Sequence, residues 1–511
     1  MAKALEDLFR GMECTILGDP ETPVGGLAFR SDAVAPGDLF SCIVGTTVDG
    51  HTFAQDAVDR GAAALVVERP LSLERADKVA QVVVADSRKG MAWSAAKFYD
   101  DPSQAFQLVG ITGTNGKTTV TYLVDHIAES CGKATGLIGT TGNKVGGVEE
   151  RAIHTTPESP DLQHLLARMR DAGAEVVAME ASSHAIDLRR IWGCTFSVTA
   201  FTNLTQDHLD YHRTLENYFE AKAKLFTADY PARRVIGIDD EWGRELCRRC
   251  REAGDDVLTT GFAQDADIHP VEVAYGTAET EVELMVRGEA FHVRYPLVGR
   301  FNVENVMTAL GIGIQLGLSM EDVVRALRDV PTPPGRLERV RTEHDGGISI
   351  YVDYAHTPDA VKNAVSTVLA LEEEAVGEDG RTIVVFGCGG DRDRGKRPLM
   401  GQAALAADYA ILTTDNPRHE DPDAIIADTV AGMGEPDGRY EVVPDRRLAI
   451  RRAIEVARPG DCILLAGKGH EDYQLVGDEV LHFDDREVAA EELERAFGGG
   501  AAGAAADGTG A

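Results

Sequence analysis

The fold of this chain is decided by the stretch Leu108-Val-Gly-Ile-Thr112 and the loop Gly113-Thr-Asn-Gly-Lys117-Thr118-Thr119 that follows it. The first run is largely apolar and of strand length. After the loop, apolar residues recur at 120, 123, 124, 127 and 128, which is helical spacing. The loop therefore lies between a strand and a helix, the context that a phosphate-binding loop requires. Ile111 stands where the general GxxxxGK[ST] pattern has its first glycine, and an ordinary glycine turn before a helix is the alternative interpretation.

The loop residues suit the phosphates of a nucleotide. Backbone N–H groups at the start of a helix can surround phosphate oxygens. Lys117 would neutralise the β- and γ-phosphates, and the Thr118 hydroxyl would bind Mg²⁺. The predicted nucleotide-binding residues of this loop are Gly113, Thr114, Asn115, Gly116, Lys117, Thr118 and Thr119.

Two further α/β regions flank this unit, which suggests three domains at roughly 150 residues each. Residues 1–102 hold apolar runs at 62–67 and 82–85, and the central domain is predicted over 103–335, up to a proline-rich breaker at 331–335. In residues 336–497, apolar runs at 383–386, 410–413 and 462–466 alternate with helical stretches, as in a doubly wound parallel sheet. The Gly/Ala-rich residues 498–511 are predicted to be disordered.

Composition excludes several classes of protein. The chain has 511 residues, with 84 acidic against 51 basic side chains and a net charge of −33, which disfavours nucleic-acid and anionic-membrane partners. It has no secretory signal and no apolar stretch of about 18 residues, so we expect a cytoplasmic protein. Eight cysteines in so long a chain do not make a disulfide framework, and Cys247-Arg-Arg-Cys250 has no second CxxC to complete a zinc site.

Three polar side chains are candidates for binding a metal. Glu180 ends the apolar run 176–179, at the strand edge where metals and phosphates bind. His208 offers a neutral nitrogen, although a lone histidine usually has a core or surface role. Lys222 by itself is typical of a charge on a helix surface. However, the chain has only 12 lysines against 39 arginines, and four of them, at 117, 222, 396 and 468, fall inside these motifs. Unlike arginine, lysine can lose its proton when buried and act as a nucleophile, for instance toward CO₂.

These residues resemble those of the Mur ligase family of ATP-dependent amide-forming enzymes, over about residues 27–483 and in the family's order. The resemblance implies an α/β, three-domain Mur ligase architecture: a UDP-sugar-binding domain, a central P-loop ATPase and a C-terminal Rossmann-like domain. It implies a CO₂-derived carbamate on Lys222, which with Glu180 and His208 would hold one Mg²⁺, while Thr118 would help to hold a second. Lys117, Glu180, His208 and Lys222 are therefore the predicted catalytic residues. Further ATP contacts implied by the resemblance are Asn302, Asn305, Arg336, Asp353 and His356.

The last domain is expected to bind an amino acid. The segments 390–392, 415–418 and 467–471 each follow one of its three apolar runs, so they would converge at one edge of a parallel sheet. Arginines there would bind a carboxylate and a glutamate would bind an ammonium group, although solvated loop charges are the alternative. The predicted contacts are Arg392, Asp415, Asn416, Pro417, Arg418, Gly467 and Glu471.

The resemblance also implies a substrate. Asp415-Asn-Pro-Arg418 is the form carried by family members that add meso-diaminopimelate, while lysine-adding members lack this arginine. Diaminopimelate has an extra carboxylate that Arg418 would bind. The predicted contacts to the UDP-muramoyl dipeptide are Ser31, Thr155, Thr156, Ser182 and Arg190, whereas Asp32, His154 and Leu188 differ from residues common in the family.

The predicted activity is ATP-dependent addition of meso-2,6-diaminopimelate to the D-glutamate of UDP-N-acetylmuramoyl-L-alanyl-D-glutamate, through an acyl phosphate, in peptidoglycan synthesis. We expect a monomer whose partners are these small molecules. The alternatives are another carboxylate-amine ligase, of lysine-adding or folylpolyglutamate type, and a regulatory P-loop ATPase. No GxGxxG with a downstream acid follows a first strand, which disfavours a dehydrogenase.

Overall fold

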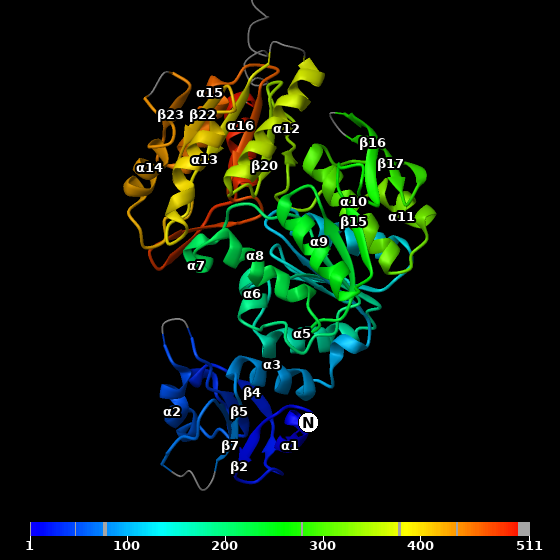
Figure 1. Cartoon of the computed structure of the whole chain (residues 1–511). Helices are drawn as coiled ribbons and strands as arrows, with labels where there is room; N and C mark the ends of the chain where they lie inside the picture. The colour runs from blue at the N-terminus through cyan, green and yellow to red at the C-terminus, as the bar shows by residue number, and fades with distance from the viewer. Residues whose placement is uncertain are drawn as a thin grey trace, which may run out of the picture.

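Three large β-sheets with their helices follow one another along the chain and in space, and the two-stranded pairs β1-β3 and β25-β26 accompany them (Figure 1). The computed structural model describes residues 2–45, 48–74, 79–276, 279–376, 380–435 and 438–498. The N-terminal sheet lies at one end, the central sheet in the middle and the C-terminal sheet at the other end. The predicted three-part α/β architecture is confirmed. The domain limits at 102/103 and 335/336 stay a prediction, and residues 499–511 of the predicted tail lie outside the described residues.

The N-terminal sheet has the strand order β2-β7-β6-β5-β4, parallel except for β2. Alternate side chains fill two cores: Leu39 and Val66 pack into one and Phe40 and Leu65 into the other. Helix α3 packs against α5 of the central part, which joins the two regions. The elements are β1 (Lys3–Ala4), α1 (Leu5–Phe9), β2 (Thr15–Leu17), β3 (Pro23–Val24), β4 (Gly26–Ala28), β5 (Asp38–Ser41), α2 (Ala54–Asp59), β6 (Ala64–Val67), β7 (Ala80–Val83) and α3 (Ser87–Phe98).

The central sheet has the order β11-β10-β9-β12-β8-β13-β14-β15-β16-β17-β18, with a parallel middle and antiparallel hairpins at both edges. Its first members along the chain are β8 (Gln107–Thr112), α4 (Lys117–Ser130), β9 (Thr135–Ile138), β10 (Asn143–Val145), β11 (Val148–Glu150), α5 (Ser159–Asp171), β12 (Val176–Glu180), α6 (Ser183–Asp187) and β13 (Val198–Phe201). They are followed by α7 (Leu209–His212), α8 (Leu215–Ala223), β14 (Arg233–Gly237), α9 (Glu241–Ala253), β15 (Val257–Thr260), β16 (Ile268–Tyr275), β17 (Thr280–Val286), β18 (Glu289–Tyr295), α10 (Arg300–Gln315) and α11 (Met320–Leu327).

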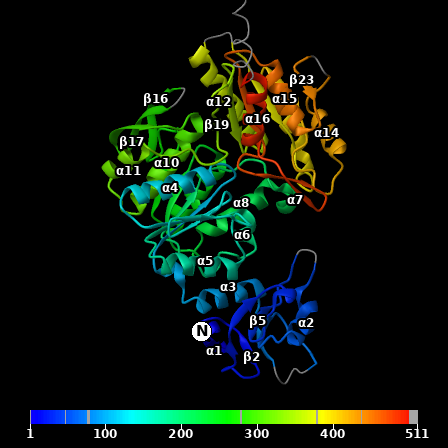
Figure 2. The same cartoon turned by 180° about the vertical axis from the view of Figure 1, so that it is seen from behind.

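Strand β8 is buried on both faces, as a central parallel strand must be. Val109 and Ile111 pack into the core shared with α4, α10 and α11, and Leu108 packs into the opposite core with α5. Figure 2 shows α4 beside α10 and α11 on one side of the sheet. The strand, loop and helix predicted around Gly113 are therefore confirmed, with α4 beginning at Lys117.

The C-terminal sheet has the order β19-β20-β24-β21-β22-β23, parallel except for β19. Helices α12, α13 and α14 cover one face, and α15 and α16 cover the other, as predicted for a doubly wound sheet. The three predicted runs form the neighbouring strands β24, β21 and β22, so the loops that follow them meet at one edge. The elements are β19 (Glu338–Val340), β20 (Ser349–Asp353), α12 (Pro358–Val376), β21 (Thr382–Phe386), α13 (Arg397–Ala404), β22 (Tyr409–Leu412), α14 (Pro422–Val430), β23 (Tyr440–Val442), α15 (Arg446–Val456), β24 (Cys462–Ala466), β25 (Tyr473–Val476), β26 (Glu479–His482) and α16 (Asp485–Phe497).

No helix in the described part of the chain is long and apolar enough to cross a membrane. All eight cysteines are free, in agreement with the prediction that they form no disulfide framework.

Candidate active site

The phosphate loop is held by contacts that only a glycine at 116 permits. Gly116 has φ +85°, and a Cβ there would lie 2.3 Å from Asn305 Oδ1 of α10. The Lys117 ammonium donates to the carbonyls of Gly113 and Thr114, at 2.9 and 2.8 Å. Its burial lowers the pKa of Lys117. The loop is thus preformed, with its lysine folded back over the turn.

Asn203, which follows β13, holds this loop in place through two hydrogen bonds. Its carbonyl accepts from Thr114 N and its Oδ1 accepts from Asn115 N, each at 2.9 Å. The Asn115 amide in turn donates to Asp359 Oδ2 of α12, at 3.3 Å. The sequence assigned Asn203 no role because an asparagine after a strand carries no specific signal.

Glu180 ends β12, next to the phosphate loop on β8. Its carboxylate accepts from Thr118 Oγ1 at 3.0 Å and from the N–H and hydroxyl of Thr140, at 2.8 and 3.0 Å. Arg336 reaches in from the C-terminal part and donates to Thr118 Oγ1 at 2.8 Å. The oxygens of Thr118 and Glu180 form a pair of hard donors of the kind that Mg²⁺ prefers. No sequence motif marked Thr140.

Lys222, on α8, is one of the largest fully buried side chains of the described chain, with 1% of its surface exposed. Its ammonium donates to Gly113 O at 2.7 Å and lies 4.5 Å from the centre of the Tyr218 ring. Burial and the nearby Lys117 charge hold the pKa of Lys222 well below its usual value. This lysine is therefore inside the site and not on a helix surface, and its neutral amine is the form that adds CO₂.

His208 lies in a left-handed backbone conformation, with φ +54°. Its ring is 4.9 Å from that of His184, and its Nε2 is 3.3 Å from Asp207 Oδ2. Burial lowers the pKa of His208 to about 3, so the imidazole is neutral at pH 7 and can act as a nitrogen ligand.

These residues line one cavity of about 460 Å³. Within the described residues, no three His, Cys, Asp or Glu side chains are grouped closely enough to hold a metal. Glu180 and His208 are two side chains of these types that line this cavity. The lining residues include Lys117, Thr118, Glu180, Ser182, His208, Lys222, Asn305, Arg336, Asp353 and His356.

Asn302 is placed differently from the other predicted nucleotide contacts. It is not among the residues that line this cavity, and its Oδ1 accepts from Asn305 Nδ2 at 3.1 Å. Its own amide donates to Val298 O at 2.8 Å. Asn302 therefore orients Asn305, one helical turn away. Asp353 accepts from Leu337 N at 2.7 Å, which ties the end of β20 to the segment that carries Arg336.

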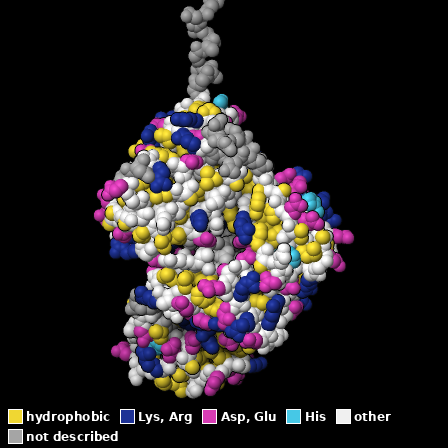
Figure 3. Space-filling view, turned by 45° about the horizontal axis from the view of Figure 1, so that its top comes forward, with side chains coloured by type: hydrophobic (Ala, Val, Ile, Leu, Met, Phe, Trp, Pro, Cys, Tyr) yellow, Lys and Arg dark blue, Asp and Glu magenta, His cyan; other side chains and the backbone are white. Residues whose placement is uncertain are grey.

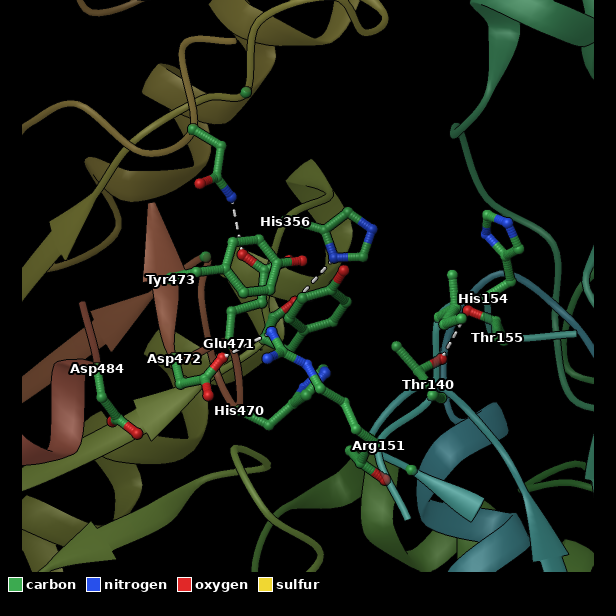
Figure 4. A pocket seen from close by; sticks show the side chains of 18 of the residues that line it. Thr140, Arg151, His154, Thr155, His356, His470, Glu471, Asp472, Tyr473 and Asp484 are labelled. Atoms are coloured by element: carbon green, nitrogen blue, oxygen red, sulfur yellow. Dashed lines mark hydrogen bonds and ion pairs between the residues drawn. The ribbon is translucent and has the colours of Figure 1, made fainter. Parts of the chain in front are cut away.

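A second cavity of about 960 Å³ opens between the central and C-terminal parts (Figure 4). Thr140, His154 and Thr155 line it from one side, and Glu471, Asp472 and Tyr473 line it from the other. The two cavities share the lining residues Thr140, Thr155, Asp207, His208, Tyr354 and His356. The nucleotide site therefore adjoins the space that the C-terminal loops surround.

The predicted amino-acid contacts come together around this second cavity. Asn416 Nδ2 donates to Glu471 Oε2 at 2.8 Å, and Arg418 donates to Gly390 O at 2.9 Å. Burial and the nearby Arg392 charge lower the pKa of Arg418. An anion bound between these two arginines would relieve their repulsion. The predicted residues that line the cavity are Arg392, Asp415, Asn416, Arg418, Gly467 and Glu471.

The predicted muramoyl contacts are more dispersed. Thr156 Oγ1 donates to Glu180 O at 2.7 Å, and Arg190 donates to Thr156 O at 3.0 Å and pairs with Glu158 at 2.9 Å. Thr155 lines both cavities and Ser182 lines the nucleotide cavity. Ser31 lies in the N-terminal part, and it is not among the described residues that line either cavity.

Asp207 was assigned no role from its sequence pattern, yet it lines both cavities. Its carboxylate accepts from Lys396 Nζ at 3.3 Å and lies 3.6 Å from His356 Nε2, both from the C-terminal part. The scarcity of lysine in the chain was the available signal for Lys396.

Three family models match this chain: "Mur ligase family, catalytic domain" over residues 23–99, "Mur ligase middle domain" over 111–313, and "Mur ligase, glutamate ligase domain" over 335–469. The UDP-N-acetylmuramoyl-L-alanyl-D-glutamate–2,6-diaminopimelate ligase of Geobacillus thermodenitrificans is 45% identical over 480 residues, 92% of this chain and 95% of the relative. The same-named ligase of Synechococcus elongatus is 46% identical over 476 residues, 91% and 93% of the two chains. A solved structure of a ligase with this name is 34% identical, covers 97% of this chain and 99% of its own, and has a TM-score of 0.67.

Proposed function

Since this chain belongs to the Mur ligase family, we propose that it uses ATP to join meso-2,6-diaminopimelate to the D-glutamate of UDP-N-acetylmuramoyl-L-alanyl-D-glutamate, in peptidoglycan synthesis. The observation that carries the proposal is the junction of two cavities. A cavity with a phosphate loop adjoins one whose lining includes Arg392, Arg418 and Glu471, so an activated carboxylate and an amine can meet between them.

The reaction divides between these cavities. In the first, the substrate carboxylate attacks the γ-phosphate of ATP, and the phosphate loop with Lys117 stabilises the charge that develops. Glu180, His208 and a carbamylated Lys222 would hold one Mg²⁺, and Thr118 would help to hold a second. The bound ions would supply positive charge to the phosphate oxygens. In the second, the amine attacks the acyl carbon of the resulting acyl phosphate, and phosphate leaves. This chemistry needs positioning and charge stabilisation and no side-chain nucleophile.

Diaminopimelate carries one more carboxylate than lysine. We propose that Arg418 and Arg392 bind a carboxylate of the amino acid and that Glu471 binds an ammonium group. We expect a folylpolyglutamate-type ligase to lack the Asp415-Asn-Pro-Arg418 segment and the N-terminal sheet. A regulatory ATPase would not need the second cavity. We expect the enzyme to act in the cytoplasm.

The carbamate on Lys222 is part of this proposal. A carbamate turns a buried lysine into an anionic oxygen ligand, which the pairing of only Glu180 and His208 otherwise lacks. Lys222→Ala should abolish ligation, and bicarbonate or a short carboxylic acid should partly restore it. Complete loss with no rescue by any small carboxylate would argue against the carbamate.

The ligase activity itself is tested by product mass. Purified protein is incubated with ATP, Mg²⁺, the UDP-linked dipeptide and either diaminopimelate or lysine. A product heavier by one diaminopimelate residue, with phosphate release that requires both acceptor and amino acid, is expected. Phosphate release without the amino acid would favour the regulatory ATPase, and equal use of lysine would contradict the assigned substrate.

A further inference from the structure

A buried lysine lies directly behind the amino-acid cavity and has no role in the mechanism above. Lys468 follows β24 in the loop Gly467-Lys-Gly-His-Glu471, and none of its surface is exposed. It is not among the residues that line the cavity, although its neighbours Gly467 and Glu471 are. Lys468 therefore does not reach a bound substrate.

The Lys468 ammonium instead faces two side chains that do line the cavity. Its Nζ lies 3.4 Å from Asn416 Oδ1 and 3.5 Å from Glu471 Oε2. Asn416 Nδ2 donates to that same Glu471 oxygen at 2.8 Å, and Asn416 Oδ1 also accepts from Leu475 N at 2.9 Å. Lys468, Asn416 and Glu471 thus form a closed set of contacts between the loops that follow β22 and β24.

The charge of Lys468 is needed at this place. Glu471 is largely buried, and the Asp415 carboxylate is close enough to raise the pKa of Glu471, whereas Lys468 lowers it. Arg446 is another buried cation that faces Glu471, but both of its bonds to a carboxylate go to Asp485, at 2.8 and 2.6 Å. The groups that face Glu471 from the surrounding elements are Asp415, Arg418, Tyr354, His356, Tyr473, Arg446 and Lys468.

We propose that Lys468 is a positioning residue for the amino-acid substrate: it holds Glu471 and Asn416 in place so that the Glu471 carboxylate receives the substrate's ammonium group. The proposal rests on the proposed function. A neutral side chain at 468 would remove one of the cations that face Glu471, and Glu471 would be protonated at higher pH.

Lys468→Met tests this proposal because it should change the KM for diaminopimelate and not the KM for ATP. With ATP and the UDP-linked dipeptide saturating, the KM for diaminopimelate should rise about tenfold, as expected when a hydrogen bond to a charged group is lost. The KM for ATP should stay unchanged. Because the pKa of Glu471 rises in the variant, the acid limb of kcat/KM for diaminopimelate should move to higher pH. Arg458→Met, which removes an exposed cation from the turn before β24, is the matched control and should change neither constant.

A double-mutant cycle with Glu471→Gln distinguishes positioning from general destabilisation. If Lys468 acts through Glu471, then Lys468→Met adds little to the effect of Glu471→Gln. Lys468→Gln, which keeps a donor but not the charge, covers the case that the methionine variant does not fold. Its unfolding midpoint is measured alongside.

Parallel rises in all three KM values would overturn the proposal, and so would a Lys468→Met effect of full size in the Glu471→Gln background. If the unmodified protein fails to ligate diaminopimelate, the proposed function falls as well. Normal ligation with an unchanged KM in Lys468→Met overturns this inference alone.

Discussion

Arg418 combines a left-handed backbone, φ +54°, with a guanidinium that points into the amino-acid cavity. The backbone N–H of Arg418 donates to Leu475 O at 3.0 Å, and Gly477 N donates to the backbone carbonyl of Arg418 at 2.7 Å. The β25–β26 hairpin therefore holds this loop in place. The side chain is thus aimed by contacts that do not depend on its charge. Its guanidinium donates to Gly390 O at 2.9 Å and lines the cavity in which the amino acid would bind.

Arg418→Ala should raise the KM for diaminopimelate between about tenfold and a hundredfold, since a charged hydrogen bond is lost. The KM for ATP should change far less, because Arg418 does not line the nucleotide cavity. Steady-state kinetics with each substrate varied in turn measures both. Equal changes in the two constants would contradict the assignment.

Three histidines with lowered pKa values predict how stability depends on pH. Burial lowers the pKa of His208 to about 3 and those of His212 and His470 to about 4, against an ordinary value of about 6.5. The unfolded chain therefore binds these protons first, and the free energy of unfolding falls as pH drops from about 6.5 toward 4. Each group contributes at most about 1.4 kcal/mol per pH unit.

His470→Gln should show a smaller fall than the unmodified protein in denaturant unfolding between pH 7 and 5. Carboxylates that titrate in the same range affect both proteins alike, so the difference between them reports on His470. Identical slopes would mean that His470 is not buried in the neutral form.

Helix α4 has a glycine in the left-handed conformation at each end, but only one of them contacts the nucleotide site. A Cβ at Gly116 would collide with Asn305, whereas a Cβ at Gly132, φ +78°, meets nothing within 4 Å. An alanine at either position would cost about 1–2 kcal/mol of stability, because it would be an L-residue in the left-handed conformation. Only the first end also loses the shape of the phosphate loop.

Gly116→Ala should therefore raise the KM for ATP about tenfold or more, through this strain and the displaced loop. Gly132→Ala should lower the unfolding midpoint about as much as Gly116→Ala does. It should leave the KM for ATP unchanged. A KM effect of equal size in both variants would show that helix stability, and not loop shape, controls nucleotide binding.

Across the whole molecule, the central and C-terminal parts meet at the reaction site. Lys396 reaches Asp207, Arg336 reaches Thr118, and Asp359 accepts from Asn115, so three bonds cross between the two parts beside the phosphate loop. The nucleotide cavity is completed by side chains from both. Any change in the relative placement of the two parts would alter both cavities together.

The excess of negative charge is also a property of the whole molecule. Acidic and basic side chains are interspersed over the face shown in Figure 3, so the charge of −33 is not confined to one visible patch. Such an excess destabilises a compact chain by self-repulsion. Between 0.01 and 1 M salt the screening length contracts from about 30 Å to about 3 Å.

We therefore expect KCl to raise the thermal midpoint by a few degrees. This corresponds to an increase in the free energy of unfolding on the order of 1 kcal/mol or more. A triple variant that replaces the exposed Glu21, Glu272 and Glu289 by glutamine should be less sensitive to salt. None of these three forms an ion pair within the described chain. A midpoint that falls with salt would show that attractive ion pairs outweigh the repulsion.

Several strands of the fold could be predicted from the sequence alone. Apolar runs such as 108–112 and 462–466 fold within a residue of their predicted limits, because a strand buried on both faces must be apolar throughout. The convergence of three C-terminal loops followed from the geometry of parallel sheets. The glycine-rich loop and the Asp415-Asn-Pro-Arg418 segment carry their signal in consecutive residues.

Contacts between distant segments had no such signal. Three hydrogen bonds show this: Thr140 to Glu180, Asn115 to Asn203 and Lys396 to Asp207. They join residues that are 40, 88 and 189 positions apart in the sequence. Asn302 illustrates the limit: its spacing from Asn305 placed both on one helical face, but only packing decided which one lines the cavity. Local patterns determine which elements form and which chemistry their ends carry. Which side chain reaches another is decided by how the sheets and domains pack, because hydrogen bonds and burial depend on distances that spacing along the chain does not specify.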